Sequence, residues 1–155
     1  MRYLQISVLS AFGLLVPAAA LAETTWDTLQ RFGWTGSWAA SCKDPPSLRN
    51  VWVVLTRDPD GTAKRKLDRG ADAPALMGVV DSAQILTPST LQARLRNDDP
   101  NWGAMNGVFF DVVQTTENDR LRTLQSKGSD GKDYIKDGTL VSSGQPSAWI
   151  YRCPN

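Results

Sequence analysis

Short runs with strand character, separated by turn-forming residues about every 8 to 12 positions, make up the chain from residue 34 onward. The clearest run covers residues 90–96, where Leu91, Ala93 and Leu95 alternate with polar side chains. Because successive side chains of a strand point to opposite faces, this alternation predicts one buried and one solvated face. No run has the length and periodicity of a substantial helix. The pattern predicts an all-β protein that folds as a single antiparallel barrel or sandwich.

The remaining strands are expected at 34–41, 50–57, 62–67, 76–80, 83–86, 107–114, 120–126, 134–135, 139–141 and 148–153. Proline, glycine, aspartate and asparagine separate these runs, and Lys136-Asp137-Gly138 is typical of a tight hairpin. Residues 97–106 form the longest irregular segment. Irregular loops of this length are uncommon in small barrels and are often functional.

Size and charge narrow the possible function classes. The 155 residues are enough for one domain of ordinary size. With 17 basic and 16 acidic residues, the net charge of +1 argues against binding of nucleic acid or anionic membrane through overall charge. The absence of histidine excludes a Ser-His-Asp triad, a Cys-His pair and a histidine-ligated metal site. We therefore expect no nucleic-acid partner, no metal, no cofactor and no catalysis.

A local cluster of basic residues allows two interpretations. Lys64-Arg65-Lys66, Arg69, Arg94 and Arg96 form one patch if their strands are neighbours. Such a patch beside an aromatic ring could bind single-stranded nucleic acid or an acidic glycan. The alternative, which we favour, is that these residues protect exposed strand edges from aggregation.

The first 22 residues have the composition of a cleaved signal peptide. Arg2 is followed by a mostly apolar stretch over 4–16, and Ala20-Leu21-Ala22 places small residues where a signal peptidase cleaves. An uncleaved anchor is the alternative, but the apolar stretch is shorter than the roughly 20 residues that span a bilayer. We expect a periplasmic or secreted protein without membrane insertion after cleavage. Residues 23–33 then form an N-terminal arm, helical or loose, and 34–155 the barrel domain.

The two cysteines, Cys42 and Cys153, both lie in the exported part of the chain. An even number of cysteines in an oxidising compartment favours a disulfide, which here ties the start of the domain to its end. On the chain-entropy model, closing so long a loop contributes about 4 to 5 kcal/mol to stability. Two free thiols are the alternative.

Two motifs at the ends of the domain resemble those of a protein family. Gly36-Ser37-Trp38 with Cys42, and Trp149 with Arg152 and Cys153, form a G-x-W-x-x-x-C start and a W-x-x-R-C end. These resemble the motifs of small exported bacterial lipocalin-like β-barrel proteins. The resemblance implies a small antiparallel barrel of about eight strands, whose N- and C-terminal strands are adjacent and joined by the disulfide. It also implies that Trp38 closes one end of the barrel, with Arg152 across its ring.

Six tryptophans are more than a small core requires, so some of them are candidates for a binding site. Trp38, Trp52 and Trp149 lie in expected strands and are assigned to the core. Trp26, Trp34 and Trp102 lie at strand ends or in loops, where exposed rings would form a rim. The ligand-binding residues predicted at the barrel mouth are Trp102, Asp98, Asp99, Asn101 and Trp34. Alternatively, Trp102 folds back to cover the open end.

The sequence therefore suggests an exported, monomeric binding module without catalysis. The number of large side chains favours a filled barrel, so a protein partner or small ligand would be contacted at the rim. One alternative is a periplasmic inhibitor of a secreted protease or lysozyme. Another is a structural or stress-related envelope protein with no discrete ligand. An enzyme that relies on carboxylate, tyrosine or serine groups is a further alternative.

Overall fold

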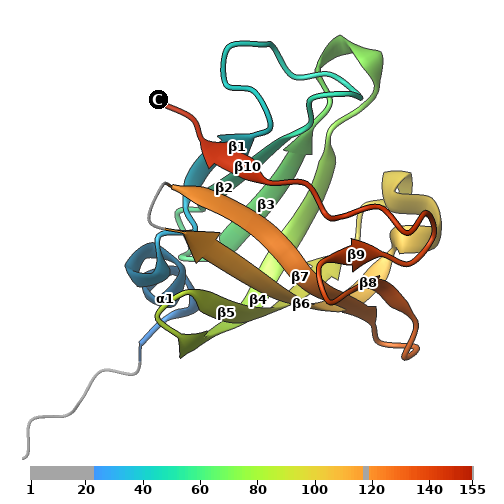
Figure 1. The fold of residues 1–155 in the computed structure, drawn as a ribbon. Helices are drawn as coiled ribbons and strands as arrows, with labels where there is room; N and C mark the ends of the chain where they lie inside the picture. Colours follow the sequence, from blue (N-terminus) through green and yellow to red (C-terminus); the bar gives the residue numbers. More distant parts are fainter. Residues whose placement is uncertain (1–22, 117–118, 155) are drawn as a thin grey trace, which may run out of the picture.

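The computed structural model describes residues 23–116 and 119–154, so the expected signal peptide lies outside the described residues. Eight antiparallel strands close into one barrel (Figure 1), which confirms the expected fold class. In order around the barrel they are β1 (Gly36–Ala39), β2 (Trp52–Arg57), β3 (Ala63–Asp68), β4 (Leu76–Thr87), β5 (Thr90–Asn97), β6 (Gly107–Thr116), β7 (Arg120–Gly128) and β10 (Ile150–Arg152).

The short last strand closes the barrel by pairing on both sides. In β10, Arg152 pairs with Trp38 of β1, while Ile150 pairs with Leu121 of β7. The Cys42–Cys153 disulfide, with Cα atoms 5.2 Å apart, lies directly beside this closure and confirms the expected pairing. The two ends of the domain are thus joined both by backbone hydrogen bonds and covalently.

A small hairpin extends the sheet beyond the closed barrel. Its strands β8 (Asp133–Lys136) and β9 (Thr139–Leu140) continue from the C-terminal part of β7, where Ser126 pairs with Ile135. At the turn, Asp137 and Gly138 have φ angles of 51° and 72°. Two successive residues with positive φ are characteristic of a type I′ turn, so the predicted tight hairpin is confirmed.

Strand β4 is longer than expected, because the two runs predicted at 76–80 and 83–86 form one strand. The register shifts between Val80 and Ser82, which marks a β-bulge at Asp81. The extra residue changes which positions face inward, from Val80 before the bulge to Ala83 after it. Polar residues in the middle of the run therefore mark a bulge, not the end of a strand.

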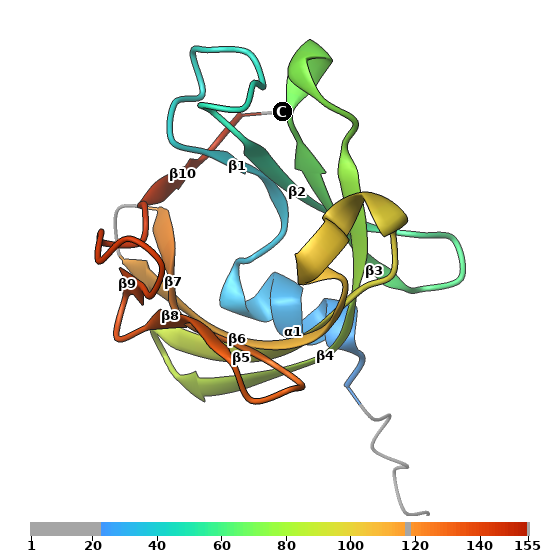
Figure 2. The same cartoon turned by 90° about the vertical axis from the view of Figure 1, so that its right-hand side faces the viewer.

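The N-terminal arm is a helix, α1 (Thr25–Phe32), which settles the two alternatives left open for residues 23–33. Thr24 and Asp27 form a capping box at its start, and Gly33 ends it with φ 88°. Leu29 is fully buried in the barrel core. The helix lies at one end of the barrel in Figure 1 and is seen through the ring of strands in Figure 2.

Large apolar side chains fill the barrel interior, led by Trp38, Leu55, Leu91, Leu95 and Val113. The core assignment is correct for Trp38 but wrong for two other tryptophans. Trp52 and Trp149 are only partly buried. Trp149 precedes β10 and lies against the guanidinium groups of Arg120 and Arg122, at 5.1 and 4.6 Å from its ring centre. These arginines alternate with the inward-facing Leu121 and so point outward.

Two 3-10 helices complete the described structure. The helix η1 (Gly70–Asp72) lies between β3 and β4, and η2 (Pro100–Met105) occupies most of the segment predicted to be irregular. In Figure 1, η2 lies at the opposite end of the barrel from α1. The barrel is therefore covered at one end by α1 and at the other by η2, a six-residue 3-10 segment that is kinked at Gly103.

Candidate functional site

The closure of the barrel fixes an arginine in place. Trp38 is 1% exposed, and the Arg152 guanidinium lies 4.5 Å from its ring centre, as the motif predicts. Arg152 Nη1 donates to the Thr35 carbonyl at 3.1 Å and Nη2 donates to the Gly33 carbonyl. The Trp38 Nε1 donates to the same Thr35 carbonyl at 3.0 Å. Arg152 is therefore held on three sides before any ligand binds.

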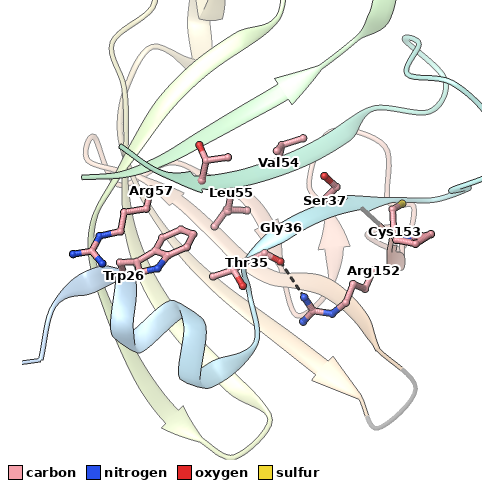
Figure 3. A pocket seen from close by; sticks show the side chains of 11 residues that line it. Trp26, Thr35, Gly36, Ser37, Val54, Leu55, Arg57, Arg152 and Cys153 are labelled. Carbon is pink, nitrogen blue, oxygen red and sulfur yellow. Dashed lines mark hydrogen bonds between the residues drawn. The ribbon is translucent and has the colours of Figure 1, made fainter. Parts of the chain in front are cut away.

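An open groove of about 670 Å³ adjoins this arginine. It runs between α1, β1, β2 and the end of the chain, and Figure 3 shows its side chains. The residues that line it are Trp26, Thr35, Gly36, Ser37, Val54, Leu55, Thr56, Arg57, Arg152, Cys153 and Pro154. Arg57 and Trp26 lie at one end and Arg152 lies at the other (Figure 3). We take this groove as the candidate functional site.

The groove carries positive charge over an apolar floor. Its lining includes two arginines and no acidic residue, together with the apolar side chains of Trp26, Val54 and Leu55. Gly36 lies between the two arginines, and a Cβ built there would meet no atom within 4 Å. With φ 77°, this position also favours glycine. The first residue of the G-x-W motif therefore leaves the middle of the groove open.

The predicted exposure of Trp102 and Trp34 is wrong. Trp102 is 8% exposed, and its Nε1 donates to the Met77 carbonyl at 2.6 Å. Its ring covers the η2 end of the barrel, which is the alternative considered for this residue. Trp34 is 3% exposed and lies at the other end, where its backbone N–H donates to the carbonyl of Leu29 in α1. The Trp34 ring is thus part of the core cluster together with Leu29, and the Trp102 ring is buried at the η2 end.

The polar residues predicted beside Trp102 do not form one site. Asp98 pairs with Arg96 on the outer surface. The Asp99 side chain precedes η2 and accepts hydrogen bonds from the backbone N and the Nδ2 of Asn101, both at 2.8 Å. Four of the five predicted ligand-binding residues thus lie within residues 98–102, around the start of η2, whereas Trp34 lies at the other end of the barrel.

A buried polar cluster was missed by sequence analysis. Arg65 Nη2 donates to Asn97 Oδ1 at 2.8 Å, while Nη1 lies 3.8 Å from Asp111 Oδ2. The Trp102 ring centre lies 5.2 Å from the guanidinium carbon. Arg65 Nε and Asp111 Oδ1 have no partner among the described residues. A signal was present, because Arg65 alternates with Ala63 and Leu67 and therefore shares their inward face.

Burial shifts the pKa values of this pair in opposite directions. Desolvation lowers the pKa of Arg65, and the attraction of Asp111 opposes that shift. Desolvation raises the pKa of Asp111, while Arg65 and a hydrogen bond from Ser126 oppose it. Each shift disfavours the charged form, because removing a charge from water costs more than the loose contact between the two groups returns.

The other basic residues of the sequence cluster are divided among separate partners. Lys64 lies 3.8 Å from Asp58, and Lys66 lies 2.8 Å from Asp68. Arg94 and Arg96 both pair with Asp81 at the β4 bulge. Arg65, between the two lysines in sequence, points into the barrel. The basic run is therefore not one continuous patch, because alternate residues of β3 face opposite sides.

Comparison of the chain with protein-family models, curated proteins and solved structures gives no match. In the part of the chain that the structure describes, no helix is long and apolar enough to cross a membrane. The same residues contain no group of three or more Cys, Asp or Glu side chains arranged to hold a metal ion. The fold and the site define an all-β protein: an eight-stranded antiparallel barrel that is closed by a disulfide and has a groove beside its last strand, β10.

Replacing Cys42 and Cys153 together with serine is expected to lower the free energy of unfolding by about 2 to 5 kcal/mol. The loop between these residues spans a sequence separation of 111, so the bond strongly restricts the unfolded chain. Urea unfolding of the oxidised protein and of the double variant measures the difference. The wild-type protein under reducing conditions is the control and should match the variant. Equal stability of all three samples would contradict the prediction.

Replacing Trp102 with phenylalanine is expected to cost about 1 to 2 kcal/mol. The change keeps an aromatic ring at the barrel end but leaves the Met77 carbonyl without its indole donor. Trp52→Phe is the matched control, because the Trp52 indole is only partly buried and its hydrogen bond to the Asp44 carbonyl is longer, at 3.3 Å. A larger loss for the control in thermal unfolding would show that Trp102 does not close the barrel.

Proposed function

We propose that the mature protein is an exported binding module without catalysis, whose ligand or partner occupies the groove between α1, β1 and β2. The observation that carries this proposal is a groove of about 670 Å³ with an apolar floor, two arginines and no acidic lining residue. An apolar surface with a few oriented polar groups is typical of a binding site. The groove lies beside α1, and none of the five ligand-binding residues predicted from the sequence lines it.

The remaining structure supports binding on the outside of the barrel. Large side chains fill the interior, which leaves the rim as the accessible surface. The disulfide is compatible with an oxidising compartment and fastens Cys153, which itself lines the groove. A site whose walls are fixed before binding loses less conformational entropy on binding.

The test is to block the groove and measure what the protein binds in its native compartment. Arg57 is exposed and lies at one end of the groove, so Arg57→Trp should fill that end without disturbing the core. Gln84→Trp on β4 is the matched control, because Gln84 is also an exposed strand residue but does not line the groove. Native mass spectrometry of the purified proteins should detect a co-purifying species with the wild-type and control proteins. Equal occupancy of the groove-blocked variant would refute the proposal.

A second candidate function, inhibition of a secreted protease, is favoured by the loop between β1 and β2. The buried Asn50 holds this loop from inside, since its Nδ2 donates to the carbonyls of Ser41, Asp44 and Pro45 at 2.9 to 3.3 Å. At the loop surface Leu48 is 58% exposed. A braced loop that presents an apolar side chain is a preorganised element for contact with another protein.

Inhibition assays against chymotrypsin, trypsin and elastase test this second function directly. The expected result is inhibition of one of these enzymes that is lost in Leu48→Ser. Val141→Ser is the matched control, because Val141 is similarly exposed, at 57%, but lies outside the loop. Absence of inhibition of all three enzymes, or equal loss in the control, would remove this candidate.

A further inference from the structure

We infer that the outer face of β7 carries a second site, where Arg120 and Arg122 together bind the phosphate group of a soluble ester or of a lipid headgroup. The site lies where the two guanidinium groups meet the Trp149 ring. None of these three residues lines the groove between α1, β1 and β2. The inference therefore goes beyond the proposed function and does not depend on it.

Trp149 holds the two arginines at one place. The guanidinium carbons of Arg120 and Arg122 lie 5.1 and 4.6 Å from the centre of its ring. Both arginines belong to one face of β7, because Leu121 between them is 3% exposed and packs in the core. Two residues along a strand correspond to about 7 Å, so the ends of both side chains can reach a single small anion.

Most hydrogen-bond donors of the two guanidinium groups remain available to a ligand. Arg122 uses one donor, because its Nε bonds to Gln114 Oε1 at 3.0 Å. Arg120 Nε is buried without a partner, so a ligand reaches this arginine through Nη1 and Nη2. Among the described residues no acceptor bonds to an Nη group of either arginine, and none of these nitrogens is buried. Paired N–H donors of this kind match the oxygens of a phosphate group.

Another pair of arginines in the same barrel shows how such a pair binds an oxyanion. Arg94 and Arg96 of β5 are also two residues apart on one strand. Both pair with Asp81, one with each carboxylate oxygen. Arg96 also pairs with Asp98, so two negative charges balance the two arginines. Arginines at this spacing on one strand therefore hold a single oxyanion between them.

The arginine pair on β7 has no such carboxylate among the residues that the structure describes. Asp119 precedes Arg120 in sequence, but its carboxylate lies 3.6 Å from Arg152 Nε. In the described chain no carboxylate forms an ion pair with Arg120 or Arg122. A phosphate monoester carries about −1.5 to −2 charges at neutral pH, so one group supplies the charge that two carboxylates supply on β5. This charge favours phosphate over a single carboxylate.

The experiment is a nuclear magnetic resonance titration of the oxidised, ¹⁵N-labelled protein with inorganic phosphate at low salt. We expect saturable shifts of the Trp149 indole N–H and of the backbone amides of β7, with binding that weakens as sodium chloride is added. Trp149→Phe identifies the indole signal among those of six tryptophans. Acetate at equal ionic strength is the control anion. It should bind at least about tenfold more weakly, because it has one charge and two oxygens.

Protein variants test the location of the phosphate. Arg120→Gln and Arg122→Gln should each weaken binding by at least about tenfold, because each removes charge-assisted hydrogen bonds. Arg57→Gln is the matched control, because Arg57 is an exposed arginine that lines the groove instead. Phosphate should raise the Tm of the wild-type and Arg57→Gln proteins but not that of Arg120→Gln/Arg122→Gln. This shift is measured within each protein, so it reports binding even where a variant is less stable.

Two further probes distinguish the sources of the phosphate group. Binding of glycerol 3-phosphate at least as tight as that of inorganic phosphate assigns the site to a soluble ester. Sedimentation with phosphatidylcholine vesicles that contain phosphatidic acid, lost in Arg120→Gln/Arg122→Gln, assigns it to a lipid headgroup. If neither probe binds, or if acetate binds as well as phosphate, the inference is wrong. Unchanged phosphate affinity in the double variant, or loss of affinity in Arg57→Gln, would also overturn it, the latter by placing the anion in the groove.

Discussion

Replacing Trp38 with alanine is expected to lower the free energy of unfolding by about 3 to 5 kcal/mol, as for other large aromatic side chains removed from a core. Trp38 is 1% exposed and packs among the residues that fill the barrel. Its removal also takes away the surface against which the Arg152 guanidinium lies. Urea unfolding followed by circular dichroism measures the loss.

Trp52→Ala is the control for Trp38→Ala. Trp52 is also a strand tryptophan, but it is only partly buried. We expect a clearly smaller loss for this variant, since less apolar surface is exposed and less cavity is created. Equal losses for the two variants would show that Trp38 does not have the special place at the barrel end that the G-x-W motif implies.

Replacing Arg65 with methionine is expected to destabilise the protein by about 3 to 5 kcal/mol at neutral pH, because it leaves the Asp111 carboxyl group inside the barrel without its cationic partner. The side chains of Arg65 and Asp111 are only 12% and 10% exposed. The double variant Arg65→Met/Asp111→Leu removes both charges and should recover most of this loss or exceed wild-type stability. A double variant as unstable as Arg65→Met would show that packing, not the unpaired charge, causes the loss.

The pH dependence gives an independent test of the Arg65→Met variant. Burial already raises the pKa of Asp111 in the folded protein, and the variant removes the attraction of Arg65 that opposes this rise. When the pKa of a carboxyl group is higher in the folded than in the unfolded state, the group destabilises the fold as pH rises from the unfolded pKa to the folded pKa. The stability difference between variant and wild type should therefore shrink as pH falls, because Asp111 becomes protonated. A difference that does not change over the whole pH range in which both proteins fold would contradict the prediction.

The Asp111 cluster also shows what alternation along a strand can reveal. Asp111 lies between Phe109 and Val113 in β6, and all three are buried. Its position in a central strand was visible in the sequence, and its burial follows from the period of two. Its partner was not visible, because two strands separate β3, which carries Arg65, from β6, and the two side chains meet only across the closed barrel.

The candidate site was also predictable only in part from the sequence. The G-x-W motif and the basic residue before the terminal cysteine pointed to Trp38 and Arg152, whose contact the structure confirms. Trp26 was one of three tryptophans considered for a binding rim, but Arg57 was not assigned to a site, because no local pattern relates the end of β2 to the first turn of α1. The groove exists only because closure of the barrel places these segments beside β10.

The predicted exposure of Trp102 is wrong for an energetic reason. In an irregular segment, the residues around a tryptophan do not indicate whether its indole ring faces solvent or turns inward. The choice depends on the available apolar surface and on a hydrogen-bond acceptor, which here are the open barrel end and the Met77 carbonyl. Neither is adjacent to Trp102 in the chain.

By itself the sequence determined the fold class, the positions of most strands, the Lys136-Asp137-Gly138 hairpin and the pairing of Cys42 with Cys153. The strands follow from the period-two alternation of side chains and the hairpin from its turn residues, and both of these are local patterns. The disulfide follows because two cysteines can form only one intramolecular pair. Only the tertiary structure decided the bulge at Asp81, the inward turn of Trp102, the buried Arg65–Asp111 pair and the groove beside Arg152. Each of these depends on which strands become neighbours when the sheet closes, and that is set by packing between residues far apart in the chain.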